Sequence, residues 1–274
     1  MVNCDVCKNE GSEVFLEKFG LNYLRCTQCE HVYADVSDFD YVAENEQANA
    51  SLEDTHNAKH DSPRHAKAHG ALLDEFEAYR NTNRLIEVGC SSGSFLNRAV
   101  KAGWDAIGVE PVAASAEVGI RDYGLNVIVG TLDDAAFDSD SADIIYSNAV
   151  IEHVDSPAAM VAEAARILRP GGLFYADTVN LASYTWRFLG DRWKLVDPRI
   201  HLHLFTPDSL TALCEQFGLQ VQKMTTHGVR FHATRADKPT GVNRVIDELR
   251  KGPYSFAARR NLKGDNIAVY ARKS

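Results

Sequence analysis

The chain has 274 residues, of which 45% are apolar, and it carries a formal net charge of -9. This is enough for one large α/β core with a small appendage, because domains commonly contain about 100 to 200 residues. The acidic balance argues against a general affinity for nucleic acid, whose phosphates are neutralised by Lys and Arg. No run approaches the roughly 20 apolar residues of a membrane span and no signal peptide opens the chain, so we expect a cytoplasmic protein without a membrane partner.

Four of the six cysteines form two Cys-x2-Cys pairs near the N-terminus, Cys4 with Cys7 and Cys26 with Cys29. Two such pairs at this separation match the tetrahedral zinc-ribbon pattern, so residues 1–35 are predicted to form a zinc-ribbon module. Two disulfides are the competing interpretation, but thiols persist as metal ligands in a reducing cytosol. Four thiolates leave no coordination position for water, so we expect a structural zinc whose binding supplies folding energy.

A polar, acidic stretch at 36–61 follows, which we interpret as a linker that could order over a cofactor. Regular structure resumes at Ser62-Pro63, an N-cap and first-turn signal for a helix. The domain that begins here is expected to run from 62 to 274. Apolar residues then recur at helical spacing at Leu72, Leu73, Phe76 and Tyr79.

Short apolar strands alternate with amphipathic helices in the rest of the chain. The expected strands are 85–88, 106–109, 127–129, 143–146, 173–176, 219–224 and 267–271, and the expected helices include 95–102, 158–169 and 206–218. Such alternation implies parallel βαβ units. We therefore predict an α/β, doubly wound, Rossmann-like sheet of seven strands with the last strand antiparallel, whose ligand lies over the carboxyl ends of the strands.

The loop that follows the first of these strands, residues 87–93, carries a glycine at each end of a short turn and opens a helix. Glu110 lies 21 residues past Gly89, where a carboxylate suits a ribose diol. Ser91 occupies the position of the second glycine in Gly-x-Gly-x-x-Gly, which disfavours a pyrophosphate. The pattern therefore favours a cofactor without phosphates and with cationic groups, such as S-adenosylmethionine (SAM), over a purely structural glycine turn.

Four segments, at 85–96, 108–111, 150–154 and 168–172, resemble successive motifs of class I SAM-dependent methyltransferases. The resemblance covers Arg84 to about Leu219. It implies that Glu87, Gly89 and Gly93 line the methionine side of SAM, Glu110 holds the ribose, Leu132 and Asp133 flank the adenine, and Asn148 lies near the sulfonium. Cys90, Phe95 and Pro111 belong to the same motifs and complete the predicted cofactor-binding set.

The paired cysteines and the segment 197–207 resemble one subgroup of this family, bacterial enzymes that modify sugars, lipids or natural products. The resemblance implies methyl transfer to a small-molecule acceptor, and a hydroxyl acceptor needs a base. We rank His201 first, His153 second and His203 third as base or substrate orienter, against helix capping or packing as the alternative. A divalent metal held by Glu152, His153 and a later histidine is a further alternative, although Ala149 stands where an additional acid is expected.

Two excursions, at 180–205 and 226–264, are expected on the substrate side. The second carries nine Lys or Arg and three acidic residues, so it is read either as a solvated loop or as a clamp for a phosphorylated or nucleotide-linked acceptor. An RNA methyltransferase is a rival function, but residues 1–35 hold six acids and three bases, a poor surface for a polyanion. A non-enzymatic SAM-binding scaffold is the second rival.

Overall fold

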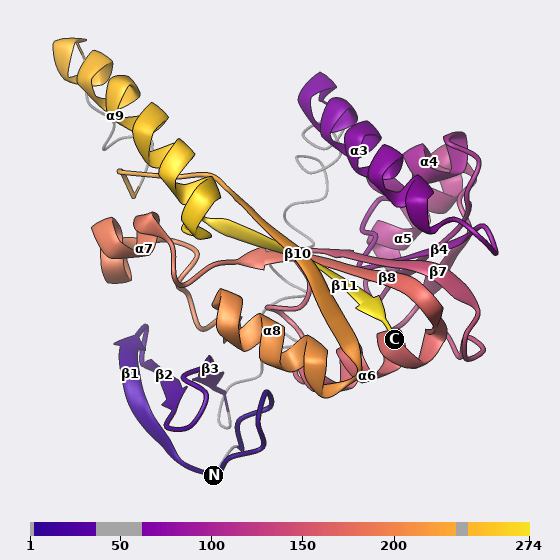
Figure 1. Ribbon diagram of the computed structural model, residues 1–274, viewed down its shortest axis with the longest axis horizontal. Coiled ribbons are helices and arrows are strands. Elements are labelled where there is room, and N and C mark those ends of the chain that lie inside the picture. Colours follow the sequence, from indigo (N-terminus) through magenta and orange to yellow (C-terminus); the bar gives the residue numbers. More distant parts are fainter. Residues whose placement is uncertain (1–2, 37–61, 234–240) are drawn as a thin grey trace.

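Seven strands form one sheet, in the order β10-β11-β8-β7-β4-β5-β6. The computed structural model describes residues 3–36, 62–233 and 241–274 (Figure 1). Strands β4 to β8 are parallel, and β11 runs antiparallel between β8 and β10. The strands are β4 (Arg84–Val88), β5 (Asp105–Glu110), β6 (Val127–Val129), β7 (Ala142–Asn148), β8 (Leu168–Val179), β10 (Leu219–His227) and β11 (Asn266–Lys273). The predicted Rossmann-like sheet with an antiparallel last strand is confirmed.

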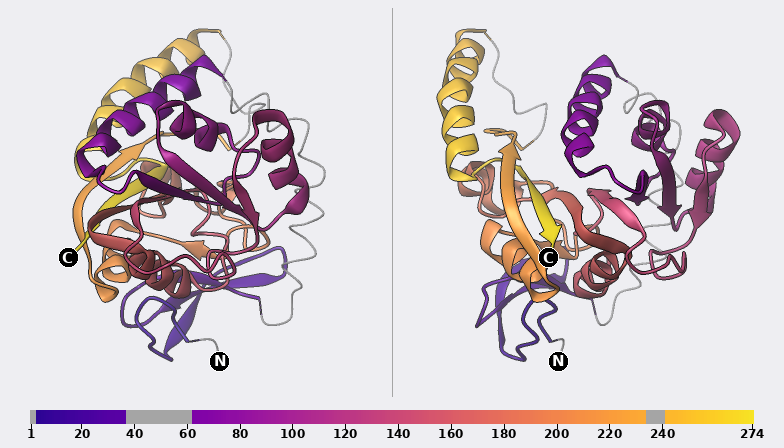
Figure 2. Two further views of the ribbon diagram at one scale, coloured as in Figure 1. Left: turned by 90° about the vertical axis from the view of Figure 1, so that its right-hand side faces the viewer. Right: turned by 45° about the vertical axis from the view of Figure 1, so that its right-hand side comes forward.

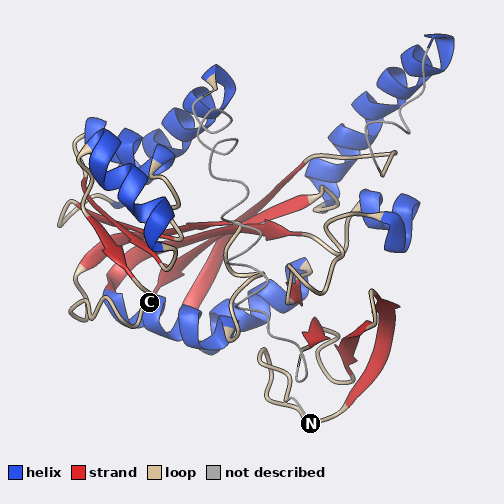
Figure 3. Ribbon diagram, turned by 180° about the vertical axis from the view of Figure 1, so that it is seen from behind, coloured by secondary structure: helices blue, strands red, loops and turns tan. Residues whose placement is uncertain are grey.

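Helices cover both faces of this sheet (Figure 3). Successive residues of a strand point to opposite faces, so Ile144 packs in the cluster with α3 and α4, and its neighbour Ile145 packs in the cluster with α6 and α8. None of the described helices combines the length and the apolar character that crossing a bilayer requires. The helices are α3 (Pro63–Phe76), α4 (Ser94–Lys101), α5 (Ala113–Tyr123), α6 (Pro157–Ile167), α7 (Tyr184–Leu189), α8 (Pro207–Gln216) and α9 (Gly241–Asn261), with short 3-10 turns η1 (Glu77–Tyr79) and η2 (Gly190–Arg192).

Three helices begin where a hydroxyl residue precedes proline, as the sequence predicts. Ser62, Ser156 and Thr206 each cap a helix by accepting a hydrogen bond from the amide three residues later, with proline in the first turn. The cap satisfies an amide that the helix leaves unbonded, and proline has no amide to lose there. Helix α6 ends at Ile167, two residues earlier than expected, because Leu168 already begins β8.

The second excursion contains a helix that the sequence analysis did not predict. Helix α9 occupies 21 residues of the basic segment 226–264 and projects from the body of the molecule (Figures 1 and 2). Gly252 and Pro253 within it obscure the helical pattern, because both residues disfavour helix interiors. The expected linker at 36–61 lies, apart from Val36, outside the described residues.

The N-terminal ribbon, residues 3–36, shares its sheet with the rest of the chain. Its strands are β1 (Ser12–Lys18), β2 (Leu21–Cys26) and β3 (Val32–Asp35), and the fourth strand of that sheet is β9 (His203–Leu204). Val32 pairs with Leu204 and Tyr33 with His203 in an antiparallel register. Figures 1 and 2 show the ribbon beside α8. The predicted module is thus completed by a strand that lies 167 residues or more further along the chain.

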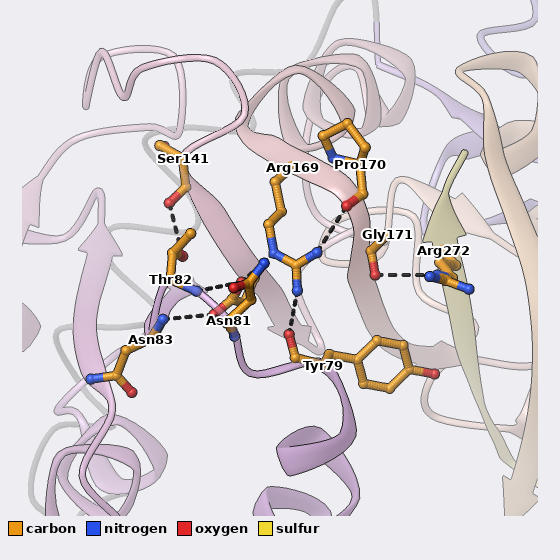
Figure 4. Close-up of polar contacts among 10 residues, drawn as sticks. Tyr79, Asn81, Thr82, Asn83, Ser141, Arg169, Pro170, Gly171 and Arg272 are labelled. Atoms are coloured by element: carbon orange, nitrogen blue, oxygen red, sulfur yellow. Dashed lines mark hydrogen bonds and ion pairs between the residues drawn. The ribbon is translucent and has the colours of Figure 1, made fainter.

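A buried carboxylate anchors the turn that leads into β4. Asp143, fully buried at the start of β7, accepts hydrogen bonds from the amides of Asn81, Thr82 and Asn83 and forms an ion pair with Arg169. Figure 4 shows the Arg169 guanidinium between the carbonyls that also accept from it. Burial opposes ionisation, but the three amides and the guanidinium together hold the pKa of Asp143 below its usual value. The Asp143 carboxylate thereby fixes the turn from which β4 starts.

Replacing Asp143 with alanine is expected to lower the free energy of unfolding by about 3 kcal/mol, because the change leaves a guanidinium and three amides without their buried acceptor. Asp105→Ala is the matched control, since it removes a solvent-exposed ion pair with Arg84, and such pairs contribute about 0 to 1 kcal/mol. Urea titration followed by tryptophan fluorescence measures both changes. Equal losses in the two variants would contradict the anchoring role of Asp143.

Candidate functional site

The loop between β4 and α4 has glycine where a side chain would not fit. Gly89 has φ +70°, and a Cβ there would lie 2.4 Å from Val150 Cγ2. Gly93, the N-cap of α4, has φ +79°, and its Cβ would lie 2.3 Å from Leu125 Cδ1. Left-handed φ values and close approach are both tolerated by glycine alone without strain. The loop therefore brings bare main chain to the carboxyl end of β4.

Two buried carboxyl groups lie beside this loop. Glu110, at the end of β5, accepts hydrogen bonds from the amides of Ser91 (2.8 Å) and Val112 (2.9 Å). Glu87, in β4, is buried, and its Oε2 has no hydrogen-bond partner within the described part of the chain. Burial raises the pKa of both groups, and for Glu87 the charge of Glu110 adds to this. The unsatisfied Glu87 oxygen fits a ligand that brings a cationic donor, as SAM does.

The other residues predicted to bind the cofactor divide into two sets. Asn148, at the end of β7, is exposed, as are Pro111 and Asp133, whereas Leu132 is buried. The side chains of Cys90 and Phe95 face the core instead. Cys90 Sγ lies 2.6 Å from the position that a Cβ on Gly108 would take, and the Phe95 ring stacks on Tyr146 with centroids 3.9 Å apart. These two residues support the loop from beneath, so any contact of Cys90 with a cofactor would come from its main chain.

The four N-terminal cysteines converge as predicted. The Sγ atoms of Cys4 and Cys29 are 3.5 Å apart, as are those of Cys7 and Cys26, and all four lie within 4.8 Å of one another. A tetrahedral zinc with bonds of about 2.3 Å separates its sulfurs by about 3.8 Å, while a disulfide needs about 2.05 Å. This donor set therefore fits zinc and excludes disulfides between these cysteines.

Each cysteine pair forms the same kind of tight turn. The amide of Lys8 donates to the carbonyl of Cys4, and the amide of Glu30 donates to the carbonyl of Cys26. Lys8 and Glu30 have φ values of 60° and 58°, the left-handed conformation that closes each turn one residue after the second cysteine. The two turns hold the thiols close together by main-chain geometry.

Glu152, His153 and His201 form a cluster after the carboxyl end of β7, with ligand-type atoms all within 4.8 Å of one another. The Glu152 carboxyl is buried, accepts a hydrogen bond from Thr178 Oγ1 (2.8 Å) and lies 4.0 Å from His153 Nε2. His153 Nδ1 lies 2.7 Å from the carbonyl of Ile200. Burial raises the pKa of Glu152 to about 7 and lowers that of His153 below its usual value.

The three predicted histidines differ in exposure. His153 is partly exposed, whereas the residues His201 and His203 are buried, with 8% and 6% of their surface exposed. Burial, assisted by the neighbouring His153, lowers the pKa of His201 to about 3. His203 does not join the cluster, since its Nδ1 lies 3.1 Å from Nε2 of His31 in the ribbon, and main-chain groups of Val154 and Asp155 interact with the ring. This position suits packing between the ribbon and the sheet.

Sequence reasoning did not single out a buried acid on β8. Asp177 pairs in the sheet with Asn148, and its carboxyl accepts a hydrogen bond from Asn266 Nδ2 (3.1 Å) and lies 3.8 Å from His227 Nδ1. Burial raises the pKa of Asp177 to about 6, against the opposing effect of His227. The sequence does contain a signal for this residue, an acid within the apolar run of a central strand, because acidic residues are rarely buried unless they are paired.

A cavity of about 510 Å³ opens between the ribbon and the carboxyl end of β8. Phe15 and Trp186 line it with ring centroids 5.6 Å apart, and Arg25 lies over the Phe15 ring. Lys263, from the basic segment, lines the same cavity. The lining thus combines aromatic surface with two cationic side chains and two acidic ones, those of Glu30 and Asp208.

Known proteins resemble the chain in both sequence and fold. It is 32% identical over 120 residues to the ubiquinone biosynthesis O-methyltransferase of Methylococcus capsulatus, a match that covers 41% of this chain and about half, 51%, of that relative. It is 28% identical to the malonyl-[acyl-carrier protein] O-methyltransferase of Hahella chejuensis, over 65% of this chain and 66% of the relative. A SAM-dependent methyltransferase from Thermotoga maritima, described as a possible histamine N-methyltransferase, shares the fold with a TM-score of 0.52 at 23% identity, over 81% of this chain and 98% of that one.

The profile of the family described as "Methyltransferase domain" matches residues 40–224, which is more than half of the chain. The matched range contains the glycine loop, both buried carboxyl groups and the Glu152, His153 and His201 cluster. The fold agrees as well, since the structural similarity to the Thermotoga maritima protein extends over 81% of this chain. On these grounds the chain belongs to the methyltransferase-domain family of SAM-dependent enzymes.

Proposed function

We propose that the chain transfers the methyl group of SAM to a hydroxyl of a small-molecule acceptor. The observation that carries this proposal is the cluster of Glu152, His153 and His201 directly after β7, the strand that ends at Asn148. Methyl transfer is an in-line displacement at an activated carbon, so the protein has to align the acceptor, exclude water and take up a proton. A histidine and a carboxyl group at this edge of the sheet suit the last task.

We assign the proton acceptor to His153, ahead of His201. The carbonyl of Ile200 stabilises the tautomer of His153 with a proton on Nδ1, so the lone pair lies on Nε2, and this atom is 4.0 Å from Glu152 Oε1. Glu152 in its charged form then stabilises the imidazolium that proton uptake creates. His201 is a weaker base because burial lowers its pKa, and its ring, 4.7 Å from that of His153, serves to orient it.

For the cofactor we keep the residues that the sequence predicts. Glu87, Gly89 and Gly93 would hold the methionine part of SAM, Glu110 the ribose, Leu132 and Asp133 the adenine, and Asn148 the region of the sulfonium. Bound SAM supplies the activated methyl group. We assign a structural zinc to the four cysteines, and free thiols at metal-binding spacing agree with a cytoplasmic location.

The acceptor is proposed to be a sugar, a nucleotide-linked sugar or another phosphorylated natural product. The cavity beside the ribbon is lined by two cations, Arg25 and Lys263, and by two acids, Glu30 and Asp208, so it offers paired polar contacts, and its aromatic pair supports a planar ring. The support for a phosphorylated acceptor is therefore the excess of Lys and Arg in the segment 226–264. The relatives named above are a ubiquinone biosynthesis O-methyltransferase and a malonyl-[acyl-carrier protein] O-methyltransferase, which supports a small acceptor over RNA.

A divalent cation at the same cluster is a second candidate. Two imidazoles and one carboxyl group within 4.8 Å of one another form a donor set that transition metals accept. Such an ion would be held by Glu152, His153 and His201 and would position the acceptor hydroxyl. The cluster lacks the additional acid expected at Ala149, which would leave the site with few ligands.

Incubating the purified protein with methyl-labelled SAM and a panel of hydroxylated metabolites, including nucleotide sugars, should yield a labelled product. Mass spectrometry is expected to show one acceptor gaining one methyl group, with methyl transfer dependent on that acceptor. A panel of RNA substrates is the comparison. Methylation of RNA alone, or SAM binding without transfer to any acceptor or cell extract, would contradict the proposal.

His153→Ala is expected to lower kcat about 100-fold, the usual size of a lost general base. The wild-type kcat should rise with pH through about 7, because Glu152 loses its proton there and then stabilises the His153 imidazolium. Glu152→Gln should flatten this rise, since glutamine does not titrate. Groups facing Glu152 are Thr178, His153 and His201, with Asp177 nearby. Steady-state assays from pH 5.5 to 9 measure the profiles.

His203→Gln is the control, because this histidine contacts the ribbon and should leave the shape of the pH profile unchanged. Dialysis against EDTA separates the two candidates for the cluster. Under the base mechanism kcat is retained as long as the ribbon metal stays bound, which elemental analysis verifies. Loss of kcat with the ribbon zinc in place, and recovery on adding Mg²⁺ or Mn²⁺, would instead support the metal candidate.

Replacing Glu110 with alanine is expected to weaken SAM binding at least about tenfold, or about 1.4 kcal/mol. The change removes the acceptor of the Ser91 and Val112 amides and the proposed partner of the ribose. Isothermal titration calorimetry measures the affinity. Glu117→Ala on the exposed side of α5 is the control, and equal affinities for the two variants would rule out this role of Glu110.

A further inference from the structure

The ribbon contacts one particular stretch of the catalytic domain, the loop from η2 to β9, at several points. Lys18 Nζ donates to the carbonyls of Asp191 (2.5 Å) and Val196 (2.6 Å). The amide of Ala34 donates to the carbonyl of Leu202 (2.7 Å). All of these bonds end on main-chain carbonyls, so they fix the path of this loop whatever side chains it carries.

Tyr23 makes the contact that lies nearest the histidine cluster. Its side chain is completely buried, and its hydroxyl donates a hydrogen bond of 2.7 Å to the carbonyl of His201. This carbonyl belongs to the residue whose ring packs 4.7 Å from that of His153. The carbonyl of the preceding residue, Ile200, is the one that His153 Nδ1 contacts. The ribbon thus holds the peptide unit that follows the His201 ring, and this unit adjoins the peptide unit whose carbonyl contacts His153.

The same loop is tied to Glu152 from its other end. The amide of His203 donates to the carbonyl of Glu152 (3.0 Å) and β9 pairs with β3 of the ribbon. A segment bonded on one side to the ribbon and on the other to the catalytic cluster has little freedom to move independently of either. The four thiols lie at one end of this ribbon, and Tyr23 precedes Cys26 in β2 by three residues.

We propose that Tyr23 is a positioning residue, through which the metal-binding ribbon holds His201 and Ile200 in place for methyl transfer. The ribbon is therefore part of the catalytic apparatus in function, although none of its side chains is in the Glu152, His153 and His201 cluster. The inference rests on the proposed function, because it takes His153 as the base. Displacement of that base by a fraction of an ångström lowers the rate without affecting the cofactor pocket.

The test compares Tyr23→Phe with a variant that breaks a different contact of the same ribbon. Asp5 lies between the first pair of cysteines and accepts hydrogen bonds from Ser156 Oγ (2.9 Å) and the amide of Ala158 (2.7 Å) at the start of α6. Asp5→Asn weakens this attachment and removes a charge that acts on His203, but it leaves the Tyr23 hydrogen bond to the His201 carbonyl in place. Both variants keep all four thiols, so elemental analysis should find the same metal content as in the wild-type protein.

Tyr23→Phe is expected to lower kcat about five- to tenfold while the SAM dissociation constant and the acceptor KM change less than about twofold. Asp5→Asn should leave kcat within about twofold of the wild-type value, even if its melting temperature falls as far as that of Tyr23→Phe. Equal kcat losses in the two variants, or an unchanged kcat in Tyr23→Phe, would overturn the positioning role.

Hydrogen–deuterium exchange followed by mass spectrometry gives a readout that does not depend on turnover. Faster exchange in residues 197–204 is expected for Tyr23→Phe, and faster exchange near the start of α6 for Asp5→Asn. If the wild-type protein methylates no acceptor, the proposed function fails and the exchange pattern alone decides whether Tyr23 holds the loop. An exchange pattern in Tyr23→Phe that matches the wild type would refute the inference in either case.

Discussion

The parallel pairing of β4 with β5 and β7 is the constraint on which the site depends. Main-chain hydrogen bonds set Glu87 beside Gly108 and Val88 beside Ser147, so the carboxyl ends of three strands reach the same edge of the sheet. Each strand then contributes a functional group at its end, and the pairing of the strands sets the position of that group. Glu110, Asn148 and the glycine loop meet because of this register, and Asp177 joins them through the pairing of β8 with β7.

Burial gives the groups at this edge their chemical character. Burial removes Glu87 and Glu110 from water and disfavours their charged forms. Hydrogen bonds from main-chain amides offset only part of this effect, so the pKa of each group is raised. A cationic cofactor is the natural counterpart of such a pair. At the next strand end, burial brings the carboxyl group of Glu152 into the range where it exchanges protons near neutrality. Burial thus acts both on the carboxyl groups of the cofactor site and on Glu152, the neighbour of the proposed proton acceptor His153.

Local signals in the sequence predicted most of the fold, and nonlocal contacts account for what they missed. Hydroxyl-proline pairs located three helix starts, and the spacing of Cys4, Cys7, Cys26 and Cys29 predicted the thiol cluster. The ranking of His201 ahead of His153 stays a prediction, and the burial of each ring, which bears on it, depends on which distant loops cover the ring. No local pattern shows that a two-residue strand at His203 completes a sheet begun by β1 to β3, because its partner is far away in sequence.

That late partner affects how the chain becomes folded. A ribosome delivers all four cysteines within the first 29 residues, yet the strand that closes the ribbon sheet is among the last quarter or so of the chain to emerge. Until then the edge of β3 has main-chain groups without their final partner, the kind of edge that promotes association with other chains. Early capture of a metal ion would hold the nascent ribbon in shape during this interval. With the structural zinc proposed above, the order of synthesis would make zinc supply a factor in the yield of folded protein as well as in its stability.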